Sequence, residues 1–282
     1  MTAAAEPAAT VEALLEHARR RLAAAAIEEP RRTAESLLGF VIGCERSQLF
    51  AHPERALPAE RAEQFQRLVA RRAGGEPTQY ILGMREFFGR DFEVNPAVLI
   101  PRPETELLVD WVLETAPEMA RVLDVGTGSG CIAVTLACER PLWEICATEI
   151  SEPALEVAEN NARRMKARVD FRQGDLTAPF EGESFDVVVS NPPYVALGDR
   201  TTLSREVRRE PAIALFAGDD GLEVYRRLIP AAARALKPGG LLALELGYDS
   251  LPGVLAILEG WDDIETRPDL AGIPRIVLAR RP

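Results

Sequence analysis

Cysteine and histidine are both scarce in this chain, which has four cysteines and two histidines among 282 residues. The histidines, His17 and His52, lie far apart, and no group of cysteines has the spacing of a metal site or of a disulfide framework. We therefore expect no bound metal and no disulfide, and we interpret the cysteines as small buried side chains in a reducing cytoplasm. These cysteines are Cys44, Cys131, Cys138 and Cys146.

An excess of basic residues and a long apolar run are also missing. The 33 Lys and Arg residues are outnumbered by 44 Asp and Glu residues, which gives a formal net charge of −11. Such a chain is poorly suited to hold nucleic acid through its phosphates, so we expect no direct nucleic-acid partner; it suits a cationic ligand or a partner with a basic patch. No run reaches membrane-spanning length, and residues 1–9 lack the segments of a signal peptide, so we expect neither a signal peptide nor a membrane association.

Residues 1–76 are expected to form a small all-helical domain that docks a partner. Apolar residues recur at helical spacing in three stretches, which begin near Thr10, Ala34 and Ala62 and of which the last stops at Gly74-Gly75. We interpret the arginines of this domain mostly as solvated helix faces and leave open that some contact an acidic partner. They are Arg19, Arg20, Arg21, Arg31, Arg32, Arg71 and Arg72.

Residues 77–102 are expected to form a hairpin linker. The alternation in residues 85–89 and 91–94 predicts a β-hairpin, and residues 98–100 predict a further strand. Pro101-Arg102-Pro103 then opens a helix with carboxylates in its first turn, where the helix dipole favours them. A helix start explains this stretch, but the rigid corner also invites a role in a site.

Strands and helices alternate in residues 103–282. The pattern predicts an α/β fold with a doubly wound, largely parallel sheet and helices on both of its faces. The last two strands, near 264–266 and 275–279, lack a connecting helix and should form a terminal antiparallel hairpin. A helix over about 221–236 is expected to stop at the turn 237–240. Five further strands are predicted near 121–126, 144–149, 168–173, 185–190 and 241–246.

The first strand of this region runs into a glycine-rich loop and then into an apolar helix. Glycines at a strand-to-helix turn let a ligand approach the backbone closely and leave N–H groups free at the start of the helix. The motif is a weak signal by itself, but its position between a strand and a helix indicates a nucleotide-type cofactor. The predicted cofactor-binding residues of the loop are Gly126, Thr127, Gly128, Ser129 and Gly130.

The next two strands end in carboxylates. Glu149 closes the second strand of the region, where doubly wound sheets place an acidic residue that accepts hydrogen bonds from ribose hydroxyls. The third strand ends in Gly174-Asp175-Leu176, and we predict that Asp175 and Leu176 meet an adenine. The alternative is that both carboxylates are only solvated strand ends.

Asn191-Pro192-Pro193-Tyr194 follows the fourth strand and forms a stiff corner. Each proline fixes its own φ, lacks an N–H and biases the preceding residue toward an extended conformation. The corner therefore offers backbone carbonyls and the Asn191 side-chain oxygen as acceptors beside an aromatic ring, which suits a planar –NH2 group. The alternative is a proline-rich turn with a packing tyrosine, and the glycine loop upstream favours the site.

Together these motifs resemble those of the release-factor glutamine N5-methyltransferases, a family of class I S-adenosylmethionine-dependent methyltransferases. The resemblance covers residues 10–281 and implies the class I doubly wound sheet with its terminal antiparallel hairpin, preceded by the helical domain and the hairpin linker. The Pro-Arg-Pro-Glu-Thr element and the helical domain distinguish this family from adenine methyltransferases that share Asn-Pro-Pro-Tyr. The matching stretches are residues 101–106, 124–130, 190–194, 210–211, 217–222 and 271–275.

The resemblance implies S-adenosylmethionine as methyl donor and the glutamine amide of the Gly-Gly-Gln loop of a peptide chain release factor as acceptor. Asn191, which would also be a cofactor-binding residue, and the Pro192 carbonyl would accept from the amide hydrogens. Pro193 would complete the substrate-binding corner, and Tyr194 would pack against the amide plane. Positioning for in-line displacement then supplies much of the catalysis, and no general base, metal or covalent nucleophile is needed before methyl transfer.

The chain departs from the family pattern in two places. Glu149 stands where the family commonly has Asp, and Asp249-Ser250 replaces a glutamine, so we assign that loop no role. An adenine-N6 nucleic-acid methyltransferase is the alternative enzyme, which the net charge of −11 disfavours. A nucleotide-binding interaction protein is the non-catalytic alternative, which the intact acceptor corner disfavours. The oligomeric state stays open, and we favour a monomer.

Overall fold

The computed structural model describes residues 10–282, and the expectation of no signal peptide falls on residues 1–9, outside the described part. The chain divides into two compact units. One comprises the chain up to Gly83 together with Arg205–Arg209, and the other comprises Met84–Ser204 and Glu210–Pro282. From residue 10 onward, no helix is long and apolar enough to span a membrane.

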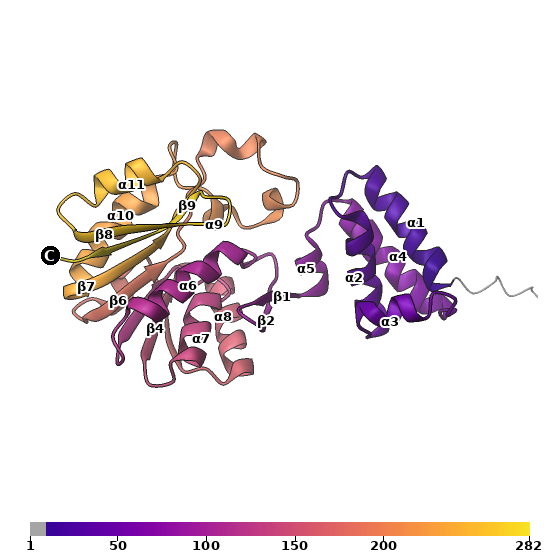
Figure 1. Cartoon of the computed structure of the whole chain (residues 1–282), viewed down its shortest axis with the longest axis horizontal. Helices are drawn as coiled ribbons and strands as arrows, with labels where there is room; N and C mark the ends of the chain where they lie inside the picture. The colour runs from indigo at the N-terminus through magenta and orange to yellow at the C-terminus, as the bar shows by residue number, and fades with distance from the viewer. Residues whose placement is uncertain (1–9) are drawn as a thin grey trace, which may run out of the picture. The chain divides into compact units, whose positions relative to one another are not determined.

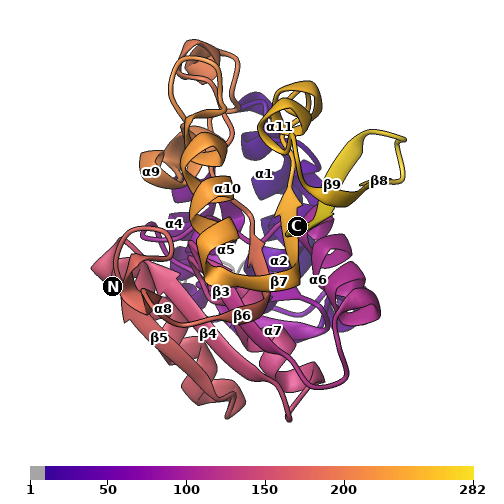
Figure 2. The same cartoon turned by 90° about the vertical axis from the view of Figure 1, so that its left-hand side faces the viewer.

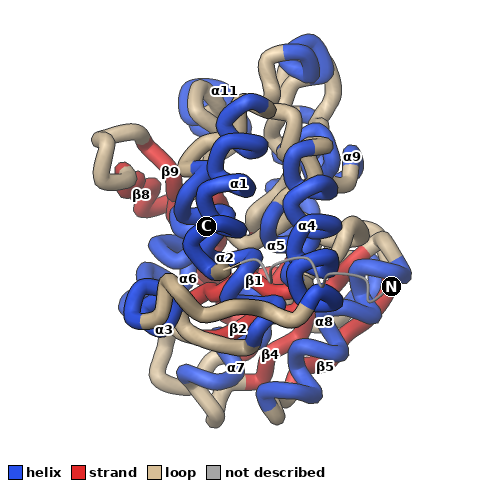
Figure 3. The backbone as a smooth tube through the Cα atoms, turned by 90° about the vertical axis from the view of Figure 1, so that its right-hand side faces the viewer, coloured by secondary structure: helices blue, strands red, loops and turns tan. Residues whose placement is uncertain are grey.

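The first unit is helical, as predicted (Figure 3). Thr10 caps its first helix, because its hydroxyl oxygen accepts from the N–H of Ala13 at 3.3 Å. The predicted apolar faces meet in one core, in which Leu22, Leu37 and Phe65 are almost fully buried. The helices are α1 (Val11–Ala24), α2 (Pro30–Ile42), α3 (Arg46–Ala51), α4 (Ala59–Ala73) and α5 (Thr78–Leu82).

Arg72 is an exception to the expectation that the arginines lie on solvated helix faces. Its side chain is buried and forms an ion pair with Glu206, which belongs to the short segment 205–209 of the same unit. Arg209 of that segment donates to the carbonyl of Gly74 at 3.1 Å. Sequence periodicity placed Arg72 on a helix face but carried no information about the distant segment that covers this face.

The predicted hairpin is present at the start of the second unit. Strands β1 (Met84–Phe87) and β2 (Arg90–Glu93) pair antiparallel. The further strand predicted at 98–100 is wrong, because Val98 lies in a bend and the next two residues belong to no regular element. The N–H of Ile100 instead donates to the carboxylate of Glu210 at 3.0 Å, so a buried side chain satisfies the backbone donor that a neighbouring strand would have bound.

A seven-stranded sheet forms the centre of the second unit, in the order β5-β4-β3-β6-β7-β9-β8. Strands β3 to β7 are parallel, and β9 lies antiparallel between β7 and β8. Figure 2 shows the parallel strands in succession from β5 to β7. The strands are β3 (Arg121–Val125), β4 (Glu144–Glu149), β5 (Val169–Gln173), β6 (Phe185–Ser190), β7 (Leu236–Glu245), β8 (Asp262–Pro268) and β9 (Pro274–Arg280).

Helices cover both faces of this sheet (Figure 1). Alternate residues of the central strands enter two separate cores, as the two-residue period of a strand requires. Val122 and Val187 pack with α6 and α7 in one core, whereas Leu123 and Val188 pack with α10 and α11 in the other. The helices of this unit are α6 (Pro103–Thr115), α7 (Cys131–Glu139), α8 (Glu152–Met165), α9 (Ala212–Leu215), α10 (Glu223–Ala235) and α11 (Leu251–Ile257).

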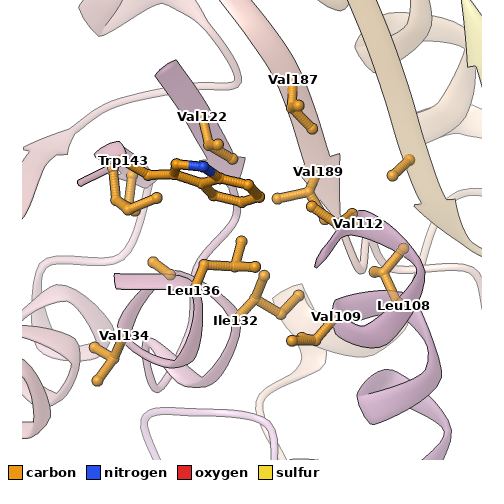
Figure 4. Close-up of a cluster of buried hydrophobic side chains, with 14 of the residues drawn as sticks. Leu108, Val109, Val112, Val122, Ile132, Val134, Leu136, Trp143, Val187 and Val189 are labelled. Carbon is orange, nitrogen blue, oxygen red and sulfur yellow. The ribbon is translucent and has the colours of Figure 1, made fainter. Parts of the chain in front are cut away.

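Figure 4 shows the first of these cores, in which Trp143 lies among aliphatic side chains of β3, α6 and α7. The indole N–H of Trp143 donates to the carbonyl of Glu118 at 3.0 Å, so its one polar atom is satisfied at the edge of the core. These contacts pack α6 and α7 against one face of the sheet.

The stretch predicted as a turn after α10 belongs to a strand. Helix α10 ends at Ala235, and β7 already begins at Leu236, which pairs with Phe185 of β6. The register between these strands shifts between Phe185 and Val187. A local irregularity therefore absorbs the Pro and Gly residues at 238–240 without ending the strand.

Candidate active site

A cavity of about 230 Å³ opens at the edge where the parallel strands end. Its lining residues all belong to the second unit. The glycine loop after β3, the end of β4 and the corner after β6 meet there because parallel strands present their carboxyl ends at one edge. Of the predicted site residues, the cavity is lined by Gly126, Thr127, Gly128, Ser129, Glu149, Asp175, Leu176, Asn191, Pro192 and Pro193.

The glycine loop borders the cavity through bare backbone. Gly126 and Gly128 have φ values of 73° and 57°, which is the left-handed region that glycine adopts without strain. A Cβ atom added to either would meet no atom within 4 Å, so open space lies beside both residues. This loop can admit a ligand against its main chain, which is what the sequence pattern predicts.

Gly130 does not line the cavity. A Cβ atom added there would lie 3.1 Å from the side chain of Ala158, so the missing side chain allows the start of α7 to approach α8. The cofactor-binding role of Gly130 therefore stays a prediction, and its visible role is packing.

Glu149 holds the loop and faces the cavity at the same time. One carboxylate oxygen accepts from the N–H of Gly128 at 2.9 Å, and the other accepts from the N–H of Ser151 at 3.0 Å. The residue is only 8% exposed. Each oxygen can accept a second hydrogen bond, so the carboxylate can also receive hydroxyl donors from a ligand.

Asp124 supports the loop from inside the protein and was not among the predicted site residues. One of its oxygens accepts from the Thr127 hydroxyl at 2.6 Å and from the N–H of Ala133 at 3.2 Å. Burial raises the pKa of this carboxyl to about 7. Its position near the end of β3 is the sequence signal that could have identified it, since the same rule identified Glu149.

Asp175 and Leu176 line the cavity beside Arg227. The Asp175 carboxylate forms an ion pair with the Arg227 guanidinium, and both side chains are about half exposed. Leu176 has a φ of 50°, which turns the chain sharply after Asp175. Their predicted contact with an adenine stays a prediction.

The corner after β6 presents an unused acceptor. Asn191 donates through Nδ2 to the hydroxyl oxygen of Thr105 at 3.1 Å. Its Oδ1 is buried and has no hydrogen-bond partner within residues 10–282. Because a buried carbonyl without a donor is costly, this atom indicates a place where a ligand supplies the donor.

Tyr194, the last residue of the corner, does not line the cavity. Its hydroxyl donates to Glu245 at 3.5 Å, and its ring packs against the backbone of Gly247. Burial raises the pKa of its hydroxyl, so Tyr194 stays protonated. The predicted contact between Tyr194 and a substrate amide stays a prediction.

The Pro101-Arg102-Pro103 corner reaches the same cavity. Pro101, Arg102 and Thr105 are among its lining residues. The Arg102 guanidinium donates to Glu210 at 2.5 Å, and the other oxygen of Glu210 accepts from the N–H of Ile100. One buried carboxylate thus anchors both ends of the segment that leads into α6.

Comparison with known proteins agrees with this arrangement. Family models described as "PrmC N-terminal domain" and "Methyltransferase small domain" match residues 13–83 and 103–218. A protein named "Release factor glutamine methyltransferase" from Koribacter versatilis is 47% identical over 277 residues, which are 97% of this chain and 99% of the relative. The chain belongs to the release factor glutamine methyltransferase family. The family member from Nitratidesulfovibrio vulgaris is 44% identical and matches 100% of this chain and 98% of its own length.

Solved structures with a similar fold are much more distant in sequence than these family members. The hMettl16 catalytic domain matches with a TM-score of 0.57 at 20% identity over 76% of this chain and 80% of that chain. A methyltransferase from Pyrococcus furiosus matches with a TM-score of 0.53 at 22% identity over 69% of this chain and 90% of that chain. These likenesses concern the fold, and they confirm the predicted class I methyltransferase sheet with its terminal antiparallel hairpin.

Two further residues at or behind the cavity were missed in the sequence. Thr105 lines the cavity, and Glu245 lies behind it and accepts from the Thr105 hydroxyl at 2.6 Å. Burial raises the pKa of Glu245 to about 7. Glu245 ends β7, so the strand-end rule could have identified it. Thr105 belongs to the Pro-Arg-Pro-Glu-Thr element, which was matched in the sequence without a site role for this residue.

Proposed function

We propose that this protein transfers a methyl group from S-adenosylmethionine to the side-chain amide nitrogen of the glutamine in the Gly-Gly-Gln motif of a peptide chain release factor. The observation that carries the proposal is the buried Asn191 Oδ1, which lacks a donor within the described residues and belongs to a corner that lines the cavity. The –NH2 group of a glutamine amide supplies such a donor. The names of the family members support the same substrate.

The cavity residues fit the proposed cofactor. Open space beside Gly126 and Gly128 allows a ligand to contact the loop, and the buried Glu149 carboxylate suits ribose hydroxyls. Leu176 and Ile150 line the same cavity and offer apolar contact to an adenine, with Asp175 at its side. Thr127, Ser129 and Gly130 complete the loop that we propose as the cofactor site, and Gly130 contributes by packing.

Catalysis then depends on the position of the amide. An amide nitrogen is a poor nucleophile because its lone pair is delocalised into the carbonyl. We infer that Asn191 Oδ1 and the Pro192 carbonyl accept from its two hydrogens, fix its orientation and raise the electron density on nitrogen, while Pro193 keeps the corner stiff. Bound S-adenosylmethionine would supply the electrophilic methyl group: as the new N–C bond forms, the S–CH3 bond breaks and its electron pair stays on the neutral thioether that leaves, and the methylated nitrogen then loses one of its two protons to solvent. Tyr194 lies behind the corner and supports it there, because its hydroxyl donates a hydrogen bond to Glu245.

The cysteine in the cavity does not act as a nucleophile in this proposal. Burial raises the pKa of the Cys131 thiol to about 12, so the reactive thiolate is essentially absent at neutral pH. Within residues 10–282 there is also no cluster of His, Cys, Asp and Glu that could hold a metal ion. Direct transfer between bound donor and oriented acceptor is the chemistry that these residues support.

Labelled-methyl transfer tests the function. The purified protein, S-adenosylmethionine with a labelled methyl group and an intact release factor should yield a labelled release factor. A release factor with Gly-Gly-Gln changed to Gly-Gly-Ala is the matched control and should stay unlabelled. Label on adenine in DNA, with none on the release factor, would favour the adenine-N6 alternative that the net charge of −11 disfavours.

We further propose that the helical unit docks the release factor. Phe50 on α3 is 48% exposed, and the guanidinium groups of Arg31 and Arg46 both lie 5.5 Å from its ring centroid. Both guanidinium groups also pair with the buried Glu35, and an exposed aromatic ring beside two arginines suits a partner surface with apolar and acidic groups. The remaining chemistry of the protein lies in the other unit, so this unit is free to serve recognition.

A substitution at this surface separates docking from catalysis. Phe50→Ser should raise KM for intact release factor about tenfold and leave KM for a short Gly-Gly-Gln peptide unchanged, because only the intact protein reaches the helical unit. Met119→Ser, which changes an exposed side chain of the other unit, is the matched control. Equal KM values for Phe50→Ser and the unaltered protein on intact release factor would rule out docking through Phe50.

We propose finally that the enzyme acts as a monomer in the cytoplasm, where release factors work. Sedimentation at micromolar concentration should give a mass near 30.9 kDa. A stable dimer under the same conditions would reject the monomer.

A further inference from the structure

Three side chains from distant parts of the second unit form a chain of hydrogen bonds that ends at Asn191. Asn191 Nδ2 lies 3.1 Å from Thr105 Oγ1, and Thr105 Oγ1 lies 2.6 Å from Glu245 Oε2. The three residues come from the corner after β6, the first turn of α6 and the end of β7. Thr105 and Glu245 are each only 2% exposed, so water does not compete for these contacts.

The single proton of the threonine hydroxyl determines which groups donate and which accept in this series of hydrogen bonds. A hydroxyl has one donor and two lone pairs, and a carboxylate only accepts. When Thr105 donates to the ionised Glu245, its oxygen can only accept from Asn191. The amide of Asn191 must then turn its –NH2 toward Thr105, which leaves Oδ1 as the atom available to a ligand. The opposite orientation would place the amide oxygen against lone pairs of Thr105.

We propose that Thr105 and Glu245 are positioning residues that fix the amide orientation of Asn191, so that its oxygen rather than its –NH2 faces the substrate. The inference rests on the proposed function in one respect, namely that the acceptor at Asn191 binds a substrate –NH2 group. Neither residue touches the reacting atoms in this account. Both act through Asn191.

The protonation state of Glu245 controls which groups donate and which accept in these hydrogen bonds. Its carboxyl faces charged groups from two elements: Glu104 on α6 raises its pKa, and Arg275 on β9 lowers it. The hydroxyl of Tyr194 donates to its other oxygen, and the Cys131 thiol on α7 stays neutral. The hydroxyl of Tyr225 on α10 donates to the Glu245 backbone carbonyl. Burial is the largest influence and raises the pKa to about 7.

The sign of the resulting pH dependence follows from this pKa. Above about 7 Glu245 is ionised, Thr105 donates to it, and Asn191 is held with Oδ1 available. Below about 7 the neutral carboxyl can donate to Thr105, whose proton then turns toward Asn191 and permits the reversed amide. We expect kcat to fall as the pH falls through about 7, with little change in cofactor affinity.

Substitutions along the chain test this in the full-length enzyme. Thr105→Val keeps the shape but removes the hydroxyl and should lower kcat about tenfold, the effect of one hydrogen bond, with KM and cofactor affinity nearly unchanged. Thr105→Ser should restore most of the activity. Thr135→Val is the matched control, because Thr135 Oγ1 is buried without a partner among the described residues and does not line the cavity.

Glu245→Gln distinguishes a pH dependence of kcat that comes from Glu245 from one that comes from another titrating group. The glutamine oxygen can still accept from Thr105 but cannot be protonated near neutral pH, so the fall of kcat below pH 7 should disappear. Asp124, whose pKa is also raised to about 7, remains in this variant. A fall of kcat that persists in Glu245→Gln would therefore assign the titration to another group and overturn the role of Glu245.

The orientation of the amide can be measured without substrate or cofactor. In 15N-labelled protein, the side-chain –NH2 signals of Asn191 are assigned by their loss in Asn191→Ala. We expect these signals to shift with a midpoint near pH 7 in the unaltered protein, to lose that titration in Glu245→Gln, and to broaden in Thr105→Val. Asn191 –NH2 signals whose chemical shift and line width change neither with pH nor with these substitutions would overturn the inference.

The two proposals fail in different ways. If the unaltered protein transfers no methyl group to a release factor, the proposed function fails, while the NMR result still decides the orientation of Asn191. If it does transfer methyl groups and a folded Thr105→Val variant keeps full kcat, the proposed function stands and the positioning role is wrong. Should Thr105→Val not fold, Glu245→Gln and Thr105→Ser decide the same question.

Discussion

Removing the side chain of Asn191 should abolish most of the activity while leaving the fold and the glycine loop intact and changing cofactor affinity less. In Asn191→Ala, the cavity loses the acceptor Oδ1, which is buried and has no other partner in the described part of the chain. Thr105 keeps its donation to Glu245, so the substitution leaves no buried donor unpaired. We therefore expect little loss of stability and a fall in kcat of about 10²–10³, comparable to the loss of one preorganised polar group in other active sites.

Single-turnover methyl transfer at saturating S-adenosylmethionine measures the chemical step, and calorimetry measures cofactor affinity. Asn191→Asp is the sharper variant, because it keeps an acceptor and adds a negative charge. This charge attracts the cationic sulfonium in the ground state, and the attraction weakens as the methyl group leaves, so binding should tighten while transfer slows. It also places a second carboxylate beside Thr105, which has only one proton to donate. Normal turnover in either variant would show that the corner only turns the chain.

Two further predictions concern the cofactor site. Glu149→Ala should weaken cofactor binding by about 1–3 kcal/mol, the range for hydrogen bonds to a charged group, and an unchanged affinity in calorimetry would contradict the ribose role of Glu149. Gly128→Ala should cost about 1 kcal/mol of stability, because its φ of 57° disfavours a side chain, and should also lower cofactor affinity, because the new methyl group enters the space beside the loop. Gly182→Ala is the matched control, with a φ of 81° and open space outside the cavity, and should lose stability alone. Equal cofactor affinity of both glycine variants would refute close approach at Gly128.

The features that were predicted correctly are governed by residues close in sequence. The helices of the first unit follow from apolar periodicity, and the β1–β2 hairpin follows from alternation. The loop at Gly126 and Gly128 needs positive φ, so glycine at these positions reveals it directly. The corner at Asn191 is stiff because of its own two prolines. Each of these signals extends over a few residues, and there the local residues alone determine the backbone conformation.

The errors occurred where a distant part of the chain decides the local structure. Residues 98–100 have strand-like composition, but Glu210 satisfies the N–H of Ile100, and the two residues are 110 positions apart. The Pro and Gly residues after Lys237 indicate a turn, yet pairing with β6 extends β7 through them. Arg72 was expected on a solvated helix face, and an ion pair with Glu206 is formed across 134 positions.

The sequence by itself determined the fold class, the glycine loop, the acidic end of β4 and the acceptor corner, since each is encoded in a short stretch. Only the tertiary structure decided which of these groups meet. Thr105 lies 86 positions from Asn191 and 140 positions from Glu245, and the sheet order that places β7 beside β6, with α6 packed over them, brings the three together. Hydrogen bonds depend on the distance and direction between atoms, and packing rather than position along the chain sets both.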